Sequence, residues 1–403
     1  MSEFKPLDIN SRIVWLDQAR GFALLGILLA NMLLFQYGMW EDLTFRPLNW
    51  YDRAAFEWTN IFAVHSFMPL FAFLFAFGMV IMKDRMDQKG NSKFRRVFFR
   101  RFLFLGIIGY LHGTYIWDGD ILLSYSVIGL ILLFLFLNRK PKTLLVWFII
   151  FMALSTLLTY GGAPEAPDQE MKNFLEQSQQ IMQYGSYQEI VDHRVNDLPP
   201  IFDDTGLLVV MLIIMPFFSF PPFLLGLYVA KKRWLHKPEN HLKGIKKAFW
   251  LSLFLGFSLK SLTLIWDEPF VYILSEGIGP LALTVFYITS IVLLAQSRAW
   301  KKLLKPFGAL GRLSLSNYLM QSVIMTTIFY GYGLGLYGKI GVLAGICLAI
   351  ACYAVQLIIS SWWLKQFKMG MFEWLWRGVT HLKVPELRRK RRMLPEQSNQ
   401  VKV

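Results

Sequence analysis

Cysteine and charge are both scarce in this sequence. Its 403 residues include two cysteines, Cys347 and Cys352, which lie five positions apart in one apolar stretch. Such a pair provides neither a disulfide framework nor the spacing of a metal site, so no metal is expected and both cysteines are expected in the helix core. Charged residues make up 17% of the chain, whereas about 25% is usual in soluble proteins. This shortage excludes an ordinary soluble domain.

Long hydrophobic runs take the place of the missing charge. The chain is 55% hydrophobic and has a mean hydropathy of +0.41. Many apolar runs approach the roughly 20 residues that a helix needs to cross a bilayer. We therefore expect an all-α, polytopic integral membrane protein, with about ten transmembrane helices forming a bundle over residues 1–364. The predicted spans are 13–37, 56–82, 102–117, 121–137, 143–160, 206–230, 248–266, 272–295, 313–330 and 340–364.

The loops between these spans alternate in charge. Residues 83–101 carry eight Lys or Arg and two acids, whereas the long 160–205 loop carries nine acids and two bases. Because basic loops stay in the cytoplasm, the alternation predicts cytoplasmic N and C termini and an extracytoplasmic 160–205 loop, which could form a short surface helix. It also explains the formal net charge of +15 without a nucleic-acid partner. Residues 365–403 are predicted as an interfacial helix, near 367–382, and a basic cytoplasmic tail.

Polar residues inside the spans fall at two depths. Ionisable groups are costly within a membrane, so they are functional candidates unless they only tie helices together. An inner set lies beside basic loops and could attract an anionic cytoplasmic ligand; it comprises Asp17, Arg20, Arg312, Asn317 and Gln321. An outer set could carry out proton chemistry on an outward-facing acceptor; it comprises Asn31, His65, His112, Asp120 and Glu276.

Each of these residues also has a structural interpretation. Asp17 and Arg20 are spaced i, i+3, so they could pair simply to fix the end of a helix. The segment from Asp118 to Asp120 could be a turn followed by the N-cap of the next helix. His112 lies close before these two carboxylates, which could poise it for proton transfer. Both interpretations stay open at the level of the sequence.

Four segments resemble one protein family. They read LDQARGFALLGILLANM (16–32), LHGTYIWDGDILLSYSVIGL (111–130), LGRLSLSNYLMQS (310–322) and FEWLWR (372–377). In this order they resemble the YeiB-like family of bacterial membrane proteins, the domain of unknown function 418, over nearly the whole chain. The resemblance implies a multi-pass protein of the bacterial plasma membrane, with the lipid bilayer as its main partner.

The first of these segments is also similar to transmembrane acyltransferases, namely the acyltransferase-3 proteins and the heparan-glucosaminide acetyltransferase group. The shared feature is a Leu-Asp-x-x-Arg-Gly start, here Leu16 to Gly21, followed by a polar residue about eleven positions after the Arg. Acyltransferase-3 proteins have a histidine there that is essential to transfer. This sequence has Asn31, as the heparan-type group does, whose catalytic histidine comes beyond the first helix. The first histidine available here is His65.

The resemblance and the two depth classes together predict a function. We expect an acyltransferase that moves an acyl group from cytoplasmic acyl-CoA, such as acetyl-CoA, to an extracytoplasmic or lipid-linked glycan. Acyl-CoA would be a co-substrate and not a resident cofactor. The alternatives are a proton-coupled transporter or flippase that uses the same polar residues, and a structural or sensory membrane protein without catalysis. The sequence does not indicate an oligomeric state.

The expected acyltransferase gives a role to most of these residues. Arg20 and Arg312 would hold the phosphates of acyl-CoA. His112, or in second place His65, would be the general base. Asp120 would orient the histidine, and Asn31 would stabilise the oxyanion.

Overall fold

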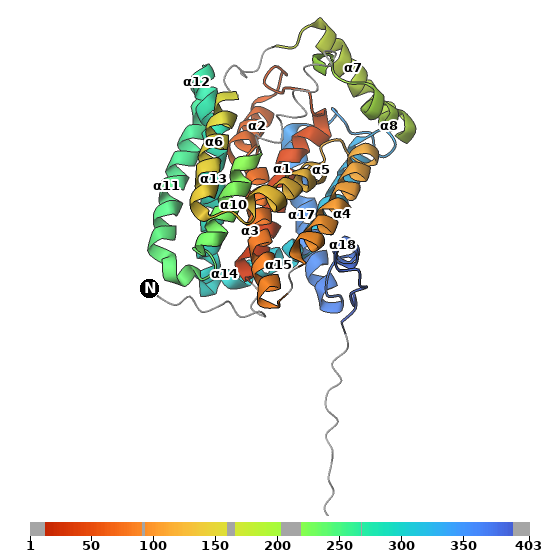
Figure 1. Cartoon of the computed structure of the whole chain (residues 1–403). Coiled ribbons are helices and arrows are strands. Elements are labelled where there is room, and N and C mark those ends of the chain that lie inside the picture. Colours follow the sequence, from red (N-terminus) through yellow and green to blue (C-terminus); the bar gives the residue numbers. More distant parts are fainter. Residues whose placement is uncertain (1–12, 91–92, 159–165, 203–218, 267, 390–403) are drawn as a thin grey trace, which may run out of the picture.

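The computed structural model describes residues 13–90, 93–158, 166–202, 219–266 and 268–389. Within these ranges the protein is all-helical, as the sequence predicted, and contains no named strand (Figure 1). Four helical stretches there are long and apolar enough to cross a membrane: Val14–Tyr37, Trp50–Gln88, Pro269–Gln296 and Val342–Gln366. The first is α1, the third comprises α12 (Pro269–Tyr272), a π-helical turn (Ile273–Ile278) and α13 (Gly279–Gln296), and the fourth is α17.

Most of the other predicted spans also coincide with helices. These are α4 (Phe94–Tyr115), α5 (Leu122–Ile131) with the π-helical turn Leu132–Phe136, α6 (Pro141–Leu158), α11 (Leu242–Ser261) and α16 (Ser314–Phe329). Helix α4 begins before the predicted residue 102, because the basic run after residue 94 is helical too. The predicted span 206–230 is described only from residue 219, where α10 (Phe220–Lys232) follows. Parts of the 160–205 loop and the basic tail after residue 389 also lie outside the described residues.

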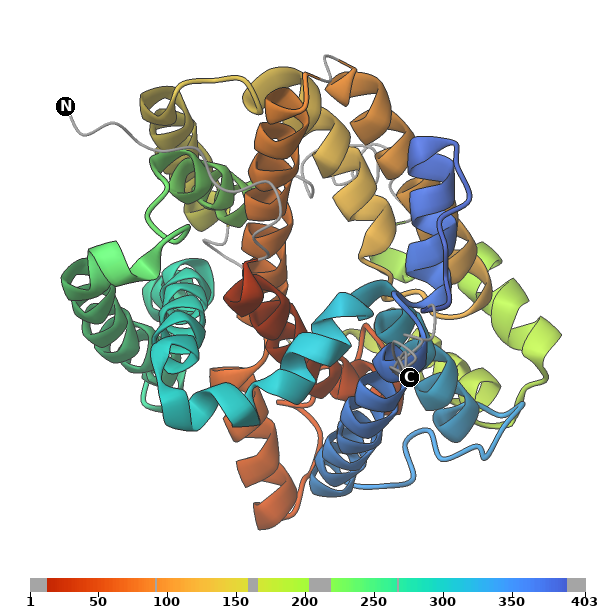
Figure 2. The same cartoon turned by 90° about the horizontal axis from the view of Figure 1, so that it is seen from below.

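Helix α1 lies at the centre of the bundle. Figure 2 looks along the bundle from below, with α3 (Phe67–Gln88), α13, α15 (Lys305–Arg312) and α17 arranged around α1. Most of the side chains of α1 are buried, including the polar Asp17, Gln18 and Asn31. Because polar groups on a central helix cannot reach lipid, they must meet other helices or a cavity.

The N-terminal end of α1, which the sequence predicts on the inner side, crosses α15 at unusually close range. A Cβ atom on Gly21 would lie 2.0 Å from the carbonyl oxygen of Phe307, and one on Gly311 would lie 1.9 Å from the carbonyl oxygen of Asp17. Only glycine allows two backbones to approach this closely, as in other small-residue helix contacts. The crossing brings Arg312, the last residue of α15, next to the inner end of α1.

The second predicted span is a broken helix. It consists of α2 (Trp50–Phe62) and α3, separated at residues 63–66. His65 lies in this break and has a φ of +58°, a left-handed conformation that is uncommon outside glycine. The hydroxyl of Thr284 on α13 donates a hydrogen bond to the Ser66 carbonyl in the same break, at 3.0 Å. The interruption is therefore held in place by a neighbouring helix.

The 160–205 segment, predicted as a loop with one short helix, contains two helices, α7 (Gln169–Tyr184) and α8 (Tyr187–Asn196). They are separated because Ser186 begins a new helix through a capping box with Glu189,. The hydrogen bonds from Ser186 hold the pKa of Glu189 below its usual value. The hydroxyl of Tyr187 donates to the Tyr115 carbonyl at 2.9 Å, which ties the pair of helices to the end of α4.

The predicted interfacial segment after α17 contains helix α18 (Met371–His381). Glu373 caps the start of α16, because one carboxylate oxygen accepts the backbone N–H of Leu315 at 2.8 Å and of Ser316 at 3.0 Å. The other oxygen accepts the Ser316 hydroxyl at 2.6 Å. Burial raises the pKa of Glu373, against the opposite effect of these hydrogen bonds. The Trp376 indole donates to the Arg101 carbonyl on α4 at 2.8 Å, so α18 joins two helices.

One expectation about α17 is wrong. Cys347 is exposed on the surface of this helix, and Cys352 is partly exposed, so Cys347 is not a core residue. The helix buries a different face, which includes Gly345, Ala349 and Tyr353. In an apolar helix without a polar face, the sequence does not distinguish the lipid-facing side from the core side.

The Glu373 cap gives a testable prediction about stability. Glu373→Ala removes three hydrogen bonds to a helix start, so the free energy of unfolding is expected to fall by about 1–3 kcal/mol. Glu386→Ala is a matched control, because Glu386 pairs with Lys368 at an exposed position and should change stability by less than about 0.5 kcal/mol. Thermal unfolding in detergent measures both. Equal losses in the two variants would contradict the capping role.

Candidate functional site

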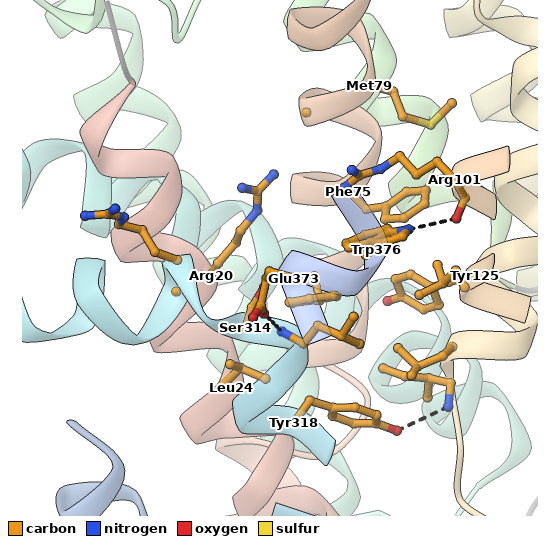
Figure 3. A pocket seen from close by; sticks show the side chains of 18 of the residues that line it. Arg20, Leu24, Phe75, Met79, Arg101, Tyr125, Ser314, Tyr318, Glu373 and Trp376 are labelled. Carbon is orange, nitrogen blue, oxygen red and sulfur yellow. Dashed lines mark hydrogen bonds between the residues drawn. The ribbon is translucent and has the colours of Figure 1, made fainter. Parts of the chain in front are cut away.

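A small cavity lies at the N-terminal end of α1, which is the predicted inner end, and is rich in arginine. It has a volume of about 180 Å³ and is shown in Figure 3. Four helices contribute arginines to its lining: Arg20 from α1, Arg101 from α4, Arg312 from α15 and Arg377 from α18. The carboxylates of Asp17 and Glu373 also line it. We call it the inner chamber; its lining has two more positive than negative side chains, which suits an anion.

The inner chamber is braced by contacts among its own lining residues. Asp17 and Arg20 form the i, i+3 ion pair that their spacing allowed, at 3.6 Å. The Arg101 guanidinium lies over the Trp376 ring, 3.6 Å from the ring centroid, a cation–π contact that fixes the side chain. In Figure 3 the side chains of Arg20 and Arg101 extend toward each other across the chamber. Arginines fixed in this way are preorganised for a phosphate or carboxylate.

A larger cavity lies at the C-terminal end of α1, which is the predicted outer end. It has a volume of about 690 Å³ and is lined by Asn31, His65, Lys260 and Glu276, among others. We call it the outer cavity. The amide oxygen of Asn31 is buried and has no hydrogen-bond partner among the described residues. A buried acceptor without a partner is costly, so a ligand group that donates a hydrogen bond to this oxygen would lower that cost.

His65 and Glu276 form a close pair in the outer cavity. Their Nδ1 and Oε2 atoms are 2.7 Å apart, and the His65 side chain is 63% exposed. The other Glu276 oxygen lies 2.7 Å from the Lys260 ammonium, and the Lys260 side chain is only 2% exposed. Such a His–Glu–Lys cluster presents one imidazole nitrogen to the cavity while a carboxylate orients the ring, the arrangement expected of a general base.

Two backbone irregularities bring these side chains together. His65 occupies the left-handed conformation in the break between α2 and α3, and Glu276 lies in the π-helical turn Ile273–Ile278. Conformations of both kinds cost free energy and are concentrated at functional sites. The contacts between His65 and Glu276 join positions 211 residues apart in the sequence.

One face of α1 connects the two cavities. Asp17, Arg20, Leu24 and Ile27 line the inner chamber, and Ile27 and Asn31 line the outer cavity. These positions are spaced by three or four residues, so they form a continuous stripe along the helix. Arg20 and Asn31 are eleven residues apart, which is about 16 Å along the axis.

His112 and Asp120 form a pair elsewhere. Their Nδ1 and Oδ1 atoms are 2.9 Å apart, and both side chains are buried. The second Asp120 oxygen accepts the Leu123 backbone N–H at 2.9 Å, so Asp120 contacts both the His112 ring and the start of α5, although the N-cap position of α5 is Ile121. The Nε2 atom of His112 is buried without a hydrogen-bond partner in the described chain. His112 lines neither the inner chamber nor the outer cavity. Its ring packs beside Tyr318, which lines the inner chamber.

Asn317 and Gln321 have structural partners. The Asn317 amide donates to the Ser360 hydroxyl on α17 at 3.0 Å, and the Gln321 amide donates to the Gln356 side chain at 2.9 Å. Both pairs are buried. Hydrogen bonds of this kind between helices stabilise membrane bundles, so this geometry supports a packing role for Asn317 and Gln321.

Sequence reasoning missed several residues of the two cavities. Lys260 lies within a predicted span. A lysine within a membrane span is itself a signal of a functional site, so the sequence could have indicated Lys260. Arg101, Glu373 and Arg377 were assigned to a basic loop and to a surface helix. No pattern in the sequence indicates that α18 folds back to close the inner chamber.

These features define an all-helical protein with membrane-type helices and a polar cavity at each end of its first helix. The chain belongs to the DUF418 family of YeiB-like proteins, as its four motifs indicated. The family model "Protein of unknown function (DUF418)" matches residues 229–383. The chain is 38% identical over 399 residues to "Uncharacterized protein YxaH" of Bacillus subtilis (strain 168), covering 95% of this chain and 97% of that one.

Two further relatives match over similar lengths. "Uncharacterized 39.9 kDa protein in amylase 3'region" of Bacillus acidopullulyticus is 29% identical, covering 93% of this chain and 96% of that one. "Uncharacterized protein YeiB" of Escherichia coli (strain K12) is 27% identical, covering 92% and 96% respectively. The similarity to these relatives therefore extends over most of the chain.

The Lys260–Glu276 pair generates a prediction. Lys260→Met leaves the largely buried Glu276 carboxylate without its ammonium partner, so the free energy of unfolding is expected to fall by about 3–5 kcal/mol. The double variant Lys260→Met/Glu276→Gln removes both charges and should recover part of this loss. Unfolding in detergent, followed by tryptophan fluorescence, compares the three proteins. A single variant as stable as the double would contradict the pairing.

Proposed function

We propose that the protein is an integral membrane acyltransferase that moves an acyl group from cytoplasmic acyl-CoA to a hydroxyl or amine of an extracytoplasmic or lipid-linked glycan. One observation carries the proposal: an arginine-lined chamber and a cavity containing Asn31 and His65 lie along the same face of α1. The inner chamber suits an anionic acyl donor, and the outer cavity suits acid–base chemistry on an acceptor. The similarity of the first segment to transmembrane acyltransferases agrees with this assignment.

In this proposal the chain crosses the bacterial plasma membrane about ten times, with both termini in the cytoplasm. The alternation of basic and acidic loops supports this topology. It assigns the inner chamber to the cytoplasmic side, because Arg20 and Arg312 lie beside basic loops, and the outer cavity to the opposite side.

The inner chamber would receive only part of the donor. At about 180 Å³ it is smaller than the 300–1,000 Å³ typical of pockets that enclose drug-sized ligands. Arg20 and Arg312 would bind phosphates at its entrance, and the flexible thioester arm would extend along α1 toward Asn31. The nucleotide would stay at the cytoplasmic mouth.

The transfer step follows from the outer cavity. We assign the general base to His65 and not to His112, because the His65 side chain is exposed and lines the same cavity as Asn31. His65 removes the proton from the acceptor hydroxyl or amine, which attacks the thioester carbonyl, and Asn31 donates a hydrogen bond to the oxyanion. The C–S bond breaks and the CoA thiolate leaves. The proton held by His65 then passes to this thiolate. Glu276 orients the imidazole.

A second candidate is a proton-coupled transporter. The observation in its favour is the ionic Lys260–Glu276–His65 cluster, since carboxylate–histidine chains at membrane depth also relay protons. Such a protein would require a proton gradient and would not respond to acyl-CoA. The two experiments below separate the two candidates.

The first experiment measures donor binding. Acetyl-CoA titrated into the purified protein in detergent, by calorimetry, should bind saturably, and Arg20→Gln should weaken binding roughly tenfold, because a charge-assisted hydrogen bond contributes about 1.5–3 kcal/mol. Lys302→Gln makes the same charge change on an exposed cytoplasmic helix and should bind like the parent. If folded protein binds neither acetyl-CoA nor longer acyl-CoAs, the transporter becomes the leading candidate.

The second experiment measures transfer. Inside-out membrane vesicles receive acetyl-CoA labelled in the acetyl group, and label in the glycan and lipid fractions is counted. His65→Ala should lower the rate by about 10²–10⁴, the usual contribution of a general base. His112→Ala should retain transfer in proportion to the amount of folded protein. If His112→Ala lowers the transfer rate more than His65→Ala does, the general base is His112.

A further inference from the structure

The inner chamber and the outer cavity meet at Ile27. Of the residues described as lining the two, Ile27 is the one that lines both. Leu24, about one turn toward the cytoplasm, lines the inner chamber, and Asn31, about one turn outward, lines the outer cavity. The Ile27 residue is 1% exposed. Its side chain therefore forms a wall between the inner chamber and the outer cavity.

Helix α3 provides the opposite side of this wall. Phe71 and Phe75 line the inner chamber, and Phe67 and Met68 line the outer cavity. The change from one cavity to the other therefore occurs between Met68 and Phe71, at the level where α3 packs against α1. The hydroxyl of Tyr125 donates to the Met68 carbonyl at 2.8 Å and fixes the backbone there.

Close packing makes this part of the wall rigid. A Cβ atom on Gly26 would lie 2.1 Å from the Phe67 ring, so the ring lies directly against α1. Phe67 also stacks on Tyr287, with ring centroids 4.5 Å apart. Ile27 is β-branched and has little rotamer freedom in a helix. In a close-packed setting the volume of such a side chain limits how far the wall between the two cavities can open.

We infer that Ile27 is the constriction through which the acyl group passes, and that its side-chain volume limits the length and branching of the acyl group. The inference rests on the proposed function, since the thioester must pass from the inner chamber to His65 and Asn31 by this route. Small straight acyl groups such as acetyl pass the native isoleucine. Longer or branched groups require a smaller residue at position 27.

The inference predicts opposite effects from two substitutions. Ile27→Ala widens the aperture, so the ratio of hexanoyl to acetyl transfer should rise by roughly tenfold or more, since pocket discrimination between acyl groups is of about this size. Ile27→Trp closes it, so transfer should be lost while acetyl-CoA binding in detergent stays within about twofold of the parent. Ile128→Ala is the matched control, because Ile128 is equally buried on α5 and is outside both cavities; its transfer ratio should equal that of the parent.

A second measurement tests the wall without requiring transfer. The single substitutions Leu24→Cys, Ile27→Cys and Asn31→Cys are made in a Cys347→Ser/Cys352→Ser background. Each protein is treated with a small methanethiosulfonate applied to either side of sealed vesicles. Position 27 should react from both sides, position 24 mainly from the cytoplasmic side and position 31 mainly from the outer side. A position 27 that reacts from neither side overturns the inference.

The outcomes for the inference and for the proposed function are distinct. If the parent binds and transfers acetyl groups but Ile27→Trp transfers normally and Ile27→Ala keeps the parental ratio, the constriction is wrong and the function stands. If the parent neither binds acyl-CoA nor transfers acyl groups, the function fails and acyl selection by Ile27 is overturned with it. Reactivity at position 27 from both sides then leaves the wall as part of a transport path.

Discussion

The cost of holding a charge away from water governs where the polar residues of this protein can lie. Within an apolar bundle each charged side chain needs a partner or a cavity. The central helix α1 has both, because Asp17 pairs with Arg20 at its inner end and Asn31 lines a cavity at its outer end. Lys260 and Glu276 satisfy the same requirement by pairing with each other. Asp17 and Arg20 line the first of the two cavities beside α1, and Asn31, Lys260 and Glu276 line the second.

Backbone geometry determines which charges meet. The crossing of α1 and α15 through Gly21 and Gly311 places Arg312 beside the inner end of α1. A side chain on either glycine would separate the helices and the arginines with them. Glu373 then fixes α18 to the start of α16, so that Arg377 also reaches the inner chamber. The electrostatic character of this chamber therefore depends on apolar helix packing as much as on the arginines themselves.

Sequence reasoning recovered the features that depend on local pattern. The apolar runs predicted α1 and α17, and the i, i+3 spacing of Asp17 and Arg20 anticipated their pair. The Asp-Gly-Asp turn placed Asp120 near His112, only eight residues away. The contact of His65 with Glu276 spans 211 residues and depends on a left-handed residue and a π-helical turn, which no periodicity reports. The partners of Asn317 and Gln321 on α17 were not predicted either. A polar stripe in the sequence does not reveal whether it faces a cavity or another helix.

The Ile27 side chain separates the two cavities, so its packing limits what can pass between them. A transporter has to let its whole substrate pass, so Ile27, α3 and the close contact at Gly26 would all have to move apart. An acyltransferase has to pass only an acyl group on a flexible arm, while the charged nucleotide stays with the arginines. The close packing of Phe67 against α1 makes the larger movement costly and the smaller passage compatible with a rigid bundle. The packing that separates the cavities is thus one reason why we propose group transfer and not transport of an entire polar molecule.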